Sequence, residues 1–261
     1  MTQDLIDYIF DHTGVDLKVN PLPASEIKAL EMAADGDVNL LSCYLKRRIS
    51  GEPLAYILGF IDLDGLRIPV DKRAYITDPE AIYLVRHLKE VLGKLPSQRV
   101  LEVGTGCGSL SFCLEHQCQD HQYVAVDIDS NPIDLARETA QKRDSRIHFV
   151  VSDYFMGLPA EYTPDLIFAD PPWGNELSIY DDDRPVSHYH SMPGISVWPF
   201  KSITGIHEQI VDAILLEGWD CPVFMNFGML DVDSIRAAIR RAPHAELIQA
   251  AKNVTLAKLT F

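Results

Sequence analysis

One segment of this 261-residue chain has the composition of a ligand-binding turn. An apolar run over residues 99–103 leads into Gly104, Gly106 and Gly108, and a helix is expected to begin directly afterwards. Glycines at this spacing let the backbone bend tightly and approach a ligand, and they expose N–H groups at the start of a helix. A second apolar run follows over 122–127 and ends in an acid, Asp127. The pair predicts a site at the ends of two neighbouring strands.

A third apolar run ends in the tetrad Asp170-Pro-Pro-Trp173. The two prolines fix the backbone, and they leave the Asp170 side chain and the Pro171 carbonyl as paired hydrogen-bond acceptors. Such a pair can hold an NH2 group with its lone pair directed at a reactive carbon. Trp173 adds an aromatic face for a planar or cationic group. This segment therefore predicts an acceptor site.

Alternating strands and helices must position these residues. We expect strands at 99–103, 122–127, 147–151, 165–169, 222–227, 245–251 and 254–260, and helices near 109–116, 131–141, 203–217 and 231–241. Such alternation predicts an α/β fold with a mostly parallel sheet that is covered on both faces. Ligands bind beyond the carboxyl ends of such strands, where all three segments fall. Only two residues separate the last two strands, which should form an antiparallel hairpin.

The first third of the chain has a different pattern. Residues 1–50 predict a small domain of three short helices, and 51–59 breaks the helical pattern. An alternating segment around Asp64-Gly65 predicts a β-hairpin, so residues 51–72 are expected to be a hairpin linker. Residues 73–261 would then form the ligand-binding domain, with a helix that begins at Asp78-Pro79.

Composition narrows the classes of function. The formal charge of −15 argues against nucleic acid as the main partner. No apolar run is long enough to cross a membrane, and the acidic N-terminus lacks the basic flank of a signal peptide, so we expect a cytoplasmic protein. The five cysteines form no CxxC pair, which argues against disulfides and structural zinc. The sequence does not indicate an oligomeric state.

Two alternative sites can be weighed from spacing. His188 and His190 lack a third spaced ligand, so we expect no metal and interpret 181–190 as a polar loop over the pocket, with both histidines near the acceptor. A dinucleotide site would need a longer glycine turn, but Ser109 occupies the place of its third glycine. Both alternatives are therefore disfavoured.

Together the three segments resemble the S-adenosylmethionine (SAM) site of a class I methyltransferase. The chain also resembles the HemK/PrmC family, which methylates a glutamine side-chain amide in peptide release factors. Residues 47–59 and 71–81 are similar to further signatures of that family. The resemblance implies a Rossmann-like, seven-stranded methyltransferase domain, an N-terminal helical domain joined by a β-hairpin, and SAM as cofactor.

The resemblance also assigns residues. It implies that the glycine turn receives the methionine part of SAM, that Glu102 faces its ammonium group, and that Asp127 binds the ribose. Asp153 would accept from the adenine amino group. The family implies Gly104, Gly106, Asp127 and Asp153 for SAM and the 170–173 tetrad for the acceptor. With their neighbours in the chain, the predicted cofactor residues are Glu102, Gly104, Thr105, Gly106, Gly108, Asp127, Ile128, Asp153 and Tyr154. The predicted catalytic residues are Asp170, Pro171 and Trp173, and the predicted acceptor residues are Asp170, Pro172, Trp173, His188 and His190.

Departures from the family leave the acceptor open. The family tetrad is Asn-Pro-Pro-Tyr, and the glutamic acid that commonly precedes a late glycine is missing from the segment that ends at Gly228. Asp170 adds a negative charge beside the sulfonium, which suits an amine better than a neutral amide. The acceptor is thus a release-factor glutamine or a small nitrogen nucleophile. Alternatively, SAM could cyclise to azetidine-2-carboxylate with release of methylthioadenosine, or the chain could be a non-catalytic SAM-binding module.

Overall fold

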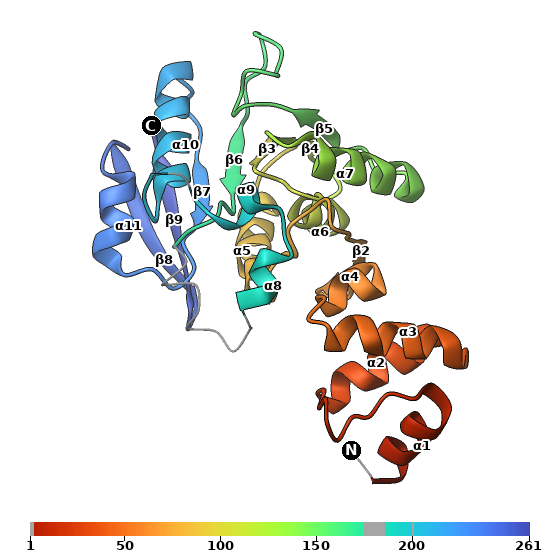
Figure 1. Cartoon of the computed structure of the whole chain (residues 1–261). Coiled ribbons are helices and arrows are strands. Elements are labelled where there is room, and N and C mark those ends of the chain that lie inside the picture. Colours follow the sequence, from red (N-terminus) through yellow and green to blue (C-terminus); the bar gives the residue numbers. More distant parts are fainter. Residues whose placement is uncertain (1–2, 175–185, 200) are drawn as a thin grey trace.

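A seven-stranded sheet forms the body of the protein (Figure 1). The computed structural model describes residues 3–174, 186–199 and 201–261. The sheet has the order β5-β4-β3-β6-β7-β9-β8, and a separate hairpin pairs β1 with β2. The strands are β1 (Phe60–Leu63), β2 (Leu66–Pro69), β3 (Arg99–Val103), β4 (Gln122–Asp127), β5 (His148–Val151), β6 (Leu166–Ala169), β7 (Val223–Asn226), β8 (His244–Ala251) and β9 (Val254–Thr260).

The strand directions confirm the predicted fold class. Strands β3 to β7 are parallel, whereas β9 runs antiparallel to both β7 and β8. Val103 is paired with Val126 on β4 and with Ala169 on β6, which in turn is paired with Met225 on β7. Because of this register, the residues that follow these four strand positions reach the same edge of the sheet.

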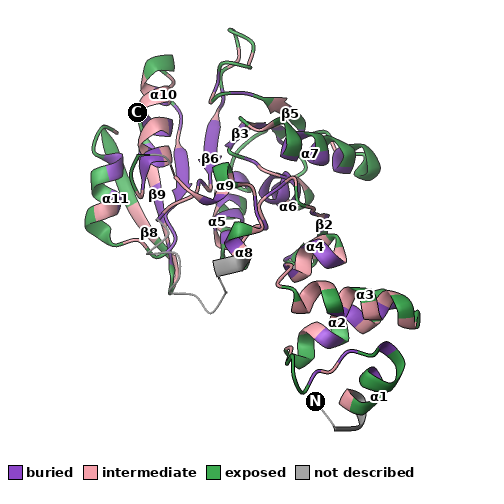
Figure 2. Cartoon of the chain, in the orientation of Figure 1, coloured by how far each residue is buried: buried purple, intermediate pink, exposed green. Residues whose placement is uncertain are grey.

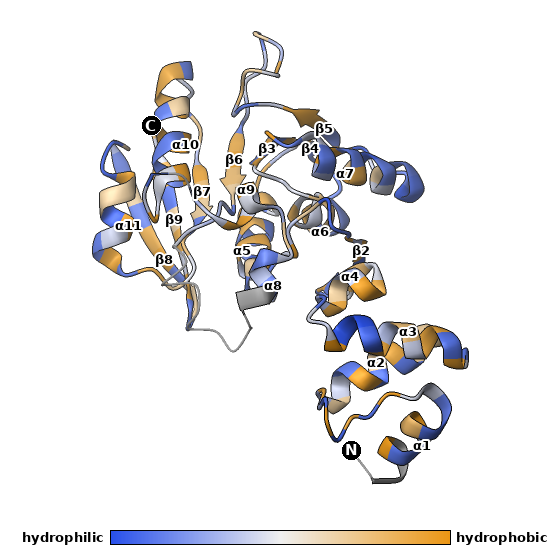
Figure 3. Cartoon of the chain, viewed as in Figure 1, coloured by the Kyte–Doolittle hydropathy of each residue, from blue (hydrophilic) through white to orange (hydrophobic). Residues whose placement is uncertain are grey.

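Helices cover both faces of the sheet, as expected for a doubly wound fold. The helices are α1 (Gln3–Thr13), α2 (Ala24–Ala34), α3 (Val38–Ile49), α4 (Leu54–Leu58), α5 (Ile82–Leu92), α6 (Ser109–Gln117), α7 (Ser130–Arg143), α8 (Val186–His190), α9 (Gly194–Val197), α10 (Gly205–Glu217) and α11 (Val232–Ile239). One core joins α5, α6 and α7 to one face, and a second joins α10 and α11 to the other. Figure 2 shows the central strands β6 and β7 buried between these layers, and Figure 3 shows their apolar character. No helix within the described ranges is both long and apolar enough to cross a membrane.

The N-terminal helices form an arm with its own small core (Figure 1). Ile9, Leu30 and Leu45 are fully buried in it, and Ile57 of α4 packs with them. The helix α4 was not expected, since 51–59 was interpreted as a break. Pro53 precedes it and Gly59 ends it in a left-handed conformation, so its single turn is bounded on both sides. We propose that the domain boundary near residue 50 lies after this helix.

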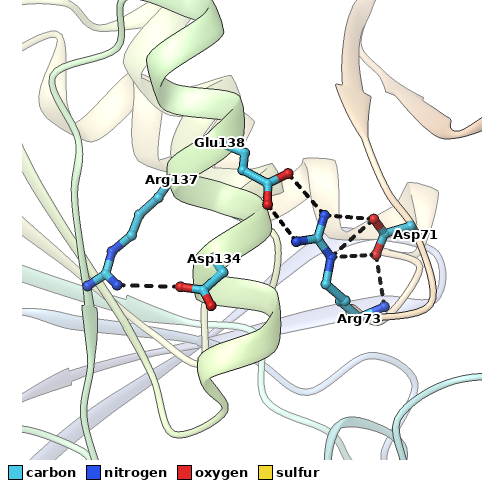
Figure 4. Close-up of polar contacts among 5 residues, drawn as sticks. All are labelled: Asp71, Arg73, Asp134, Arg137 and Glu138. Carbon is cyan, nitrogen blue, oxygen red and sulfur yellow. Dashed lines mark hydrogen bonds and ion pairs between the residues drawn. The ribbon is translucent and has the colours of Figure 1, made fainter.

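An arginine joins the segment after the hairpin to α7 of the sheet domain (Figure 4). The Arg73 guanidinium donates to both carboxylate oxygens of Asp71 and, at 2.7 and 3.1 Å, to those of Glu138 on α7. A planar guanidinium can pair with two carboxylates in this way because it presents its donors as a fixed fork. The contacts hold the segment before α5 against α7, and Arg73 also lines the cavity described below.

Two other elements differ from the sequence-based expectations. The helix predicted from Asp78 begins with a separate 3-10 turn, η1 (Pro79–Ala81), before α5. The expected polar loop over 181–190 is wrong for residues 186–190, which form α8, whereas 181–185 lie outside the described residues.

Candidate active site

A cavity of about 840 Å³ opens at the carboxyl edge of β3, β4, β5 and β6. It brings together all three segments that the sequence analysis singled out. The predicted residues on its wall are Glu102, Gly104, Thr105, Gly106, Asp127, Ile128, Asp153, Tyr154, Asp170, Pro171, Pro172 and Trp173. Their convergence follows from the strand register, because each segment directly follows a paired strand.

Asp127 closes the glycine turn against the end of β4. Its carboxylate accepts from the backbone N–H of Gly106 at 2.8 Å and from that of Asp129 at 3.0 Å. Burial raises the pKa of Asp127, and these backbone donors oppose that shift. The side chain therefore holds the turn and also borders the cavity. Asp129, the other acid considered nearby, caps α7 by accepting from the N–H of Asn131.

Glu102 lies beneath the turn and is almost completely buried. One carboxylate oxygen accepts from the hydroxyls of Thr105, at 2.6 Å, and Ser111. Burial raises the pKa of Glu102 to about 7, although these two hydrogen bonds act in the opposite direction. Glu102 is thus a cavity-wall carboxyl that can change protonation near neutral pH.

The end of β5 contributes one exposed and one anchored residue. Asp153 is exposed at the mouth of the cavity, and the neighbouring Ile128 is 53% exposed. Tyr154 has a left-handed backbone, and its hydroxyl donates to Gln209 on α10 at 2.6 Å. Such an open, mixed apolar and polar rim suits the planar end of a ligand.

The tetrad after β6 is held by the last residue of β7, Asn226, and by Gly228 just after that strand. The Asn226 side-chain amide donates to Asp170 at 2.9 Å, and its oxygen accepts from the N–H of Gly228 at 3.0 Å. Burial raises the pKa of Asp170 to about 6, and the Asn226 hydrogen bond lowers it. The Trp173 ring lies directly against Gly228, where a Cβ atom would come within 2.3 Å of it. Gly228 therefore makes room for the indole at the cavity wall.

The buried His207 side chain contacts Asn226 and Phe227. The His207 ring is stacked on Phe227, with ring centroids 4.1 Å apart, and its Nε2 lies 2.8 Å from the Asn226 carbonyl. Burial lowers the pKa of His207 to about 4, so the ring is neutral at pH 7. Because the carbonyl only accepts, Nε2 carries the proton and donates to it.

Three predicted residues do not line the cavity. His188 and His190 lie on α8, but only Tyr189 between them is part of the wall. Gly108 is buried behind the turn, with φ of +81°, and a Cβ there would lie 2.8 Å from the ring of Phe149 and 2.9 Å from that of Phe112. Gly108 therefore has a packing role at the start of α6, where its missing side chain leaves room for the rings of Phe112 and Phe149.

This explanation predicts different effects for two glycines of the turn. Gly104 and Gly108 both have a left-handed φ, but a Cβ at Gly104 meets no protein atom within 4 Å. Gly108→Ala should therefore lower the free energy of unfolding by roughly 1–3 kcal/mol more than Gly104→Ala. Urea denaturation of the two variants measures the difference. Equal losses would show that the aromatic contacts do not matter.

Several wall residues were missed by the sequence analysis. Asn226, Gln209, Tyr75 and Asp78 all line the cavity, as do residues 195–197 of α9. Asn226 could have been found, because it is a polar residue at the end of an apolar strand, as Asp127 is. Gln209 lies within an ordinary helical pattern, and no sequence signal separates it from its neighbours.

The family comparison assigns a class to this fold and site. The model of the methyltransferase small domain matches residues 76–182. The hMettl16 catalytic domain in complex with a 3′UTR hairpin has a TM-score of 0.60 at 15% identity, over 98% of this chain and 90% of that one. The T. thermophilus 16S rRNA methyltransferase RsmC in complex with AdoMet and guanosine has a TM-score of 0.54 at 15% identity, over 77% and 49%. At these identities the structural likeness concerns the fold alone. The match over residues 76–182 shows a methyltransferase small domain in this chain, and the sequence relatives below make the chain similar to the HemK group of class I methyltransferases.

The sequence relatives are more specific. The chain is 28% identical over 182 residues to the release factor glutamine methyltransferase of Lactococcus lactis, covering 70% of this chain and 66% of the relative. It is 36% identical over 163 residues to that of Streptococcus pneumoniae, covering 62% and 56%. For the Rhodopirellula baltica enzyme the values are 31% over 144 residues, 53% and 48%. The chain thus spans about half to two thirds of these relatives.

Proposed function

We propose that this protein is a SAM-dependent N-methyltransferase. Its acceptor would be a nitrogen nucleophile, either a protein glutamine, as in the names of its relatives, or a small amine. The observation that carries the proposal is the enclosure of Asp170 and Pro171 in the same cavity as the glycine turn and Asp127. The proposed cofactor site and two hydrogen-bond acceptors for a nitrogen group would thereby face the same cavity.

The wall residues fit SAM by their chemistry. Asp127 offers a half-buried carboxylate for the ribose hydroxyls, and Glu102 lies below the turn where the ammonium group is expected. The exposed Asp153 and the anchored Tyr154 would border the adenine. A cavity of about 840 Å³ is near the upper end of the range for ligand sites, so it has room for an acceptor group beside the cofactor.

Bound SAM would supply a methyl group that is already activated by the sulfonium. The acceptor nitrogen would form a bond to that carbon while the carbon–sulfur bond breaks and its electron pair stays on sulfur. The nitrogen would also lose a proton, which the Asp170 carboxylate is placed to take up. Asn226 orients that carboxylate at 2.9 Å. The protein would therefore act mainly by positioning the reactants and excluding water.

Product analysis tests the proposal. We expect S-adenosylhomocysteine and a methylated nitrogen when the protein is incubated with SAM and either a release factor or a panel of small amines. An arm without acceptor measures background. SAM binding with no product in any arm would instead favour a non-catalytic SAM-binding module.

One observation favours a second candidate reaction, cyclisation of SAM itself. Glu102 is buried, has a pKa of about 7, and lies where the SAM ammonium is expected. It could take a proton from that ammonium, after which the nitrogen attacks the side-chain carbon bonded to sulfur. That carbon–sulfur bond breaks, which releases methylthioadenosine and azetidine-2-carboxylate. Methylthioadenosine formed from SAM alone would identify this reaction.

A further inference from the structure

The beginning of α10 is hydrogen-bonded to both segments that form the acceptor side of the cavity. The backbone N–H of Gly174, directly after Trp173, donates to the carbonyl of Ile203 at 2.9 Å, two residues before the helix begins. Within the first turn of the helix, the Nε2–H of His207 donates to the carbonyl of Asn226 at 2.8 Å. The tetrad and the end of β7 are therefore attached to the same short stretch of chain.

From Asn226, the contacts continue to both ends of the tetrad. The Asn226 side-chain amide donates to Asp170 at 2.9 Å, and its oxygen accepts from the N–H of Gly228 at 3.0 Å. The Trp173 ring packs so closely against Gly228 that a Cβ there would lie 2.3 Å from the ring. Asp170 and Trp173 both line the cavity. A shift of the segment after β7 would therefore move both of these side chains.

Packing alone does not account for a histidine at position 207. The His207 side chain is fully buried, is not part of the cavity wall, and stacks on Phe227 with ring planes 24° apart, a contact that a phenylalanine could also make. Its Nδ1 has no hydrogen-bond partner among the described residues. A buried polar atom without a partner lowers stability. The feature that distinguishes the imidazole from an apolar ring is the hydrogen bond that it donates to Asn226.

We propose that His207 is a positioning residue for the acceptor side of the cavity. Through its hydrogen bond to the Asn226 carbonyl, it fixes the segment that holds Asp170 and Trp173 in place. The ring is neutral at pH 7, so it keeps this hydrogen bond without exchanging a proton with the reactants. The inference rests on the proposed function, because it concerns the acceptor side of the same site.

Fluorine NMR tests the position of Trp173 without SAM or an acceptor. The three tryptophans are labelled with 5-fluorotryptophan, and the signal that disappears in Trp173→Phe is assigned to Trp173. His207→Phe keeps a ring beside Phe227 but removes the donor, so the Trp173 signal should shift by more than its linewidth. His207→Gln places an amide N–H close to the position of Nε2 and should return the signal towards its native position.

Two variants serve as controls. His207→Asn carries the same amide as His207→Gln but reaches only to the position of Nδ1, so it should behave like His207→Phe and can replace that variant if it does not fold. His121→Phe removes another buried histidine, whose Nδ1 accepts from the N–H of Gln98 at 3.1 Å before β3. These residues precede β3 and β4, at the opposite edge of the sheet from the cavity, so the Trp173 signal should not change.

Binding and turnover then separate the two sides of the site. In His207→Phe, the affinity for SAM should stay within about twofold, because Asp127 and the glycine turn share no contact with His207. With the release factor or the small amine that yields S-adenosylhomocysteine, kcat should fall about tenfold to a hundredfold, the effect of a small misplacement of reacting groups. His207→Gln should recover most of this loss.

Three results would overturn the inference: a Trp173 signal that His207→Phe leaves unchanged, an equal change in His121→Phe, or no recovery in His207→Gln relative to His207→Asn. Failure to bind SAM, or product with no acceptor, would contradict the proposed function instead. The fluorine signal would still report whether His207 positions the tetrad, since that measurement needs neither ligand.

Discussion

Replacing Asp170 by alanine should lower kcat/KM by about 10²–10⁴-fold, the range expected for loss of a positioned proton acceptor. The substitution also removes the partner of the Asn226 amide, which is 2.9 Å away. SAM binding should change much less, because Asp127, Glu102 and the glycine turn remain. Steady-state kinetics and calorimetry with SAM measure the two effects separately. Loss of SAM affinity with unchanged turnover at saturation would contradict the assigned role.

Asp170→Asn keeps the shape and removes the charge. If ionised Asp170 is required, kcat/KM of the native protein should rise with pH through about 6 and level off above it, and the variant should lack this rise.

The contribution of Asp170 to the free energy of unfolding should change with pH in the opposite sense. Because burial raises this pKa, the folded state binds the proton more tightly than the unfolded state, so Asp170 makes stability fall as the pH increases from about 4 to about 6. Asp170→Asn should therefore be more stable than the native protein at pH 7.

The second large effect is expected at Asp127. Asp127→Ala should weaken SAM binding by about 10²–10³-fold, since hydrogen bonds to a charged group contribute roughly 1.5–3 kcal/mol each. The loss of affinity has two causes. The carboxylate borders the cavity, and it also accepts hydrogen bonds from the backbone N–H groups of Gly106 and Asp129, which fix the glycine turn. Calorimetric titration with SAM provides the measurement.

Asp129→Ala is the matched control for this prediction. It removes a neighbouring acid of equal charge whose side chain caps α7 through Asn131. It should lower the free energy of unfolding by about 0.5–2 kcal/mol and change the SAM affinity only slightly. Equal losses of affinity in both variants would show that general negative charge, and not the Asp127 carboxylate, binds the cofactor.

Much of the fold could be predicted because its signals are local. The run over 99–103 and the glycines after it predict a strand, a turn and a helix, and β3 and α6 confirm them. The one-turn helix α4 was missed because residues 54–58 are too few to show a helical periodicity of apolar residues. α8 was missed because its residues, from Val186 to His190, include polar side chains that suggested a loop.

The convergence of the proposed site residues could be predicted from the sequence, whereas the residues that hold them in place could not. Asp127 ends an apolar strand, Asp170 follows one, and Glu102 lies one residue before the end of another. Because ligands bind beyond the carboxyl ends of parallel strands, these residues are expected to meet. The hydrogen bond from Asn226 to Asp170 joins residues 56 positions apart. It depends on β6 lying beside β7, which no local pattern specifies.

The amino-acid sequence by itself determined the α/β class, the carboxyl-edge site and the acidic character of that site, because strand periodicity, turn glycines and side-chain charge are properties of short segments. Only the tertiary structure decided that Asp78 reaches the cavity with Asp170, that Gly228 makes room for Trp173, and that Gly108 serves packing. These are contacts between distant segments. Their energies depend on which strands and helices become neighbours, and therefore appear only when the chain is folded.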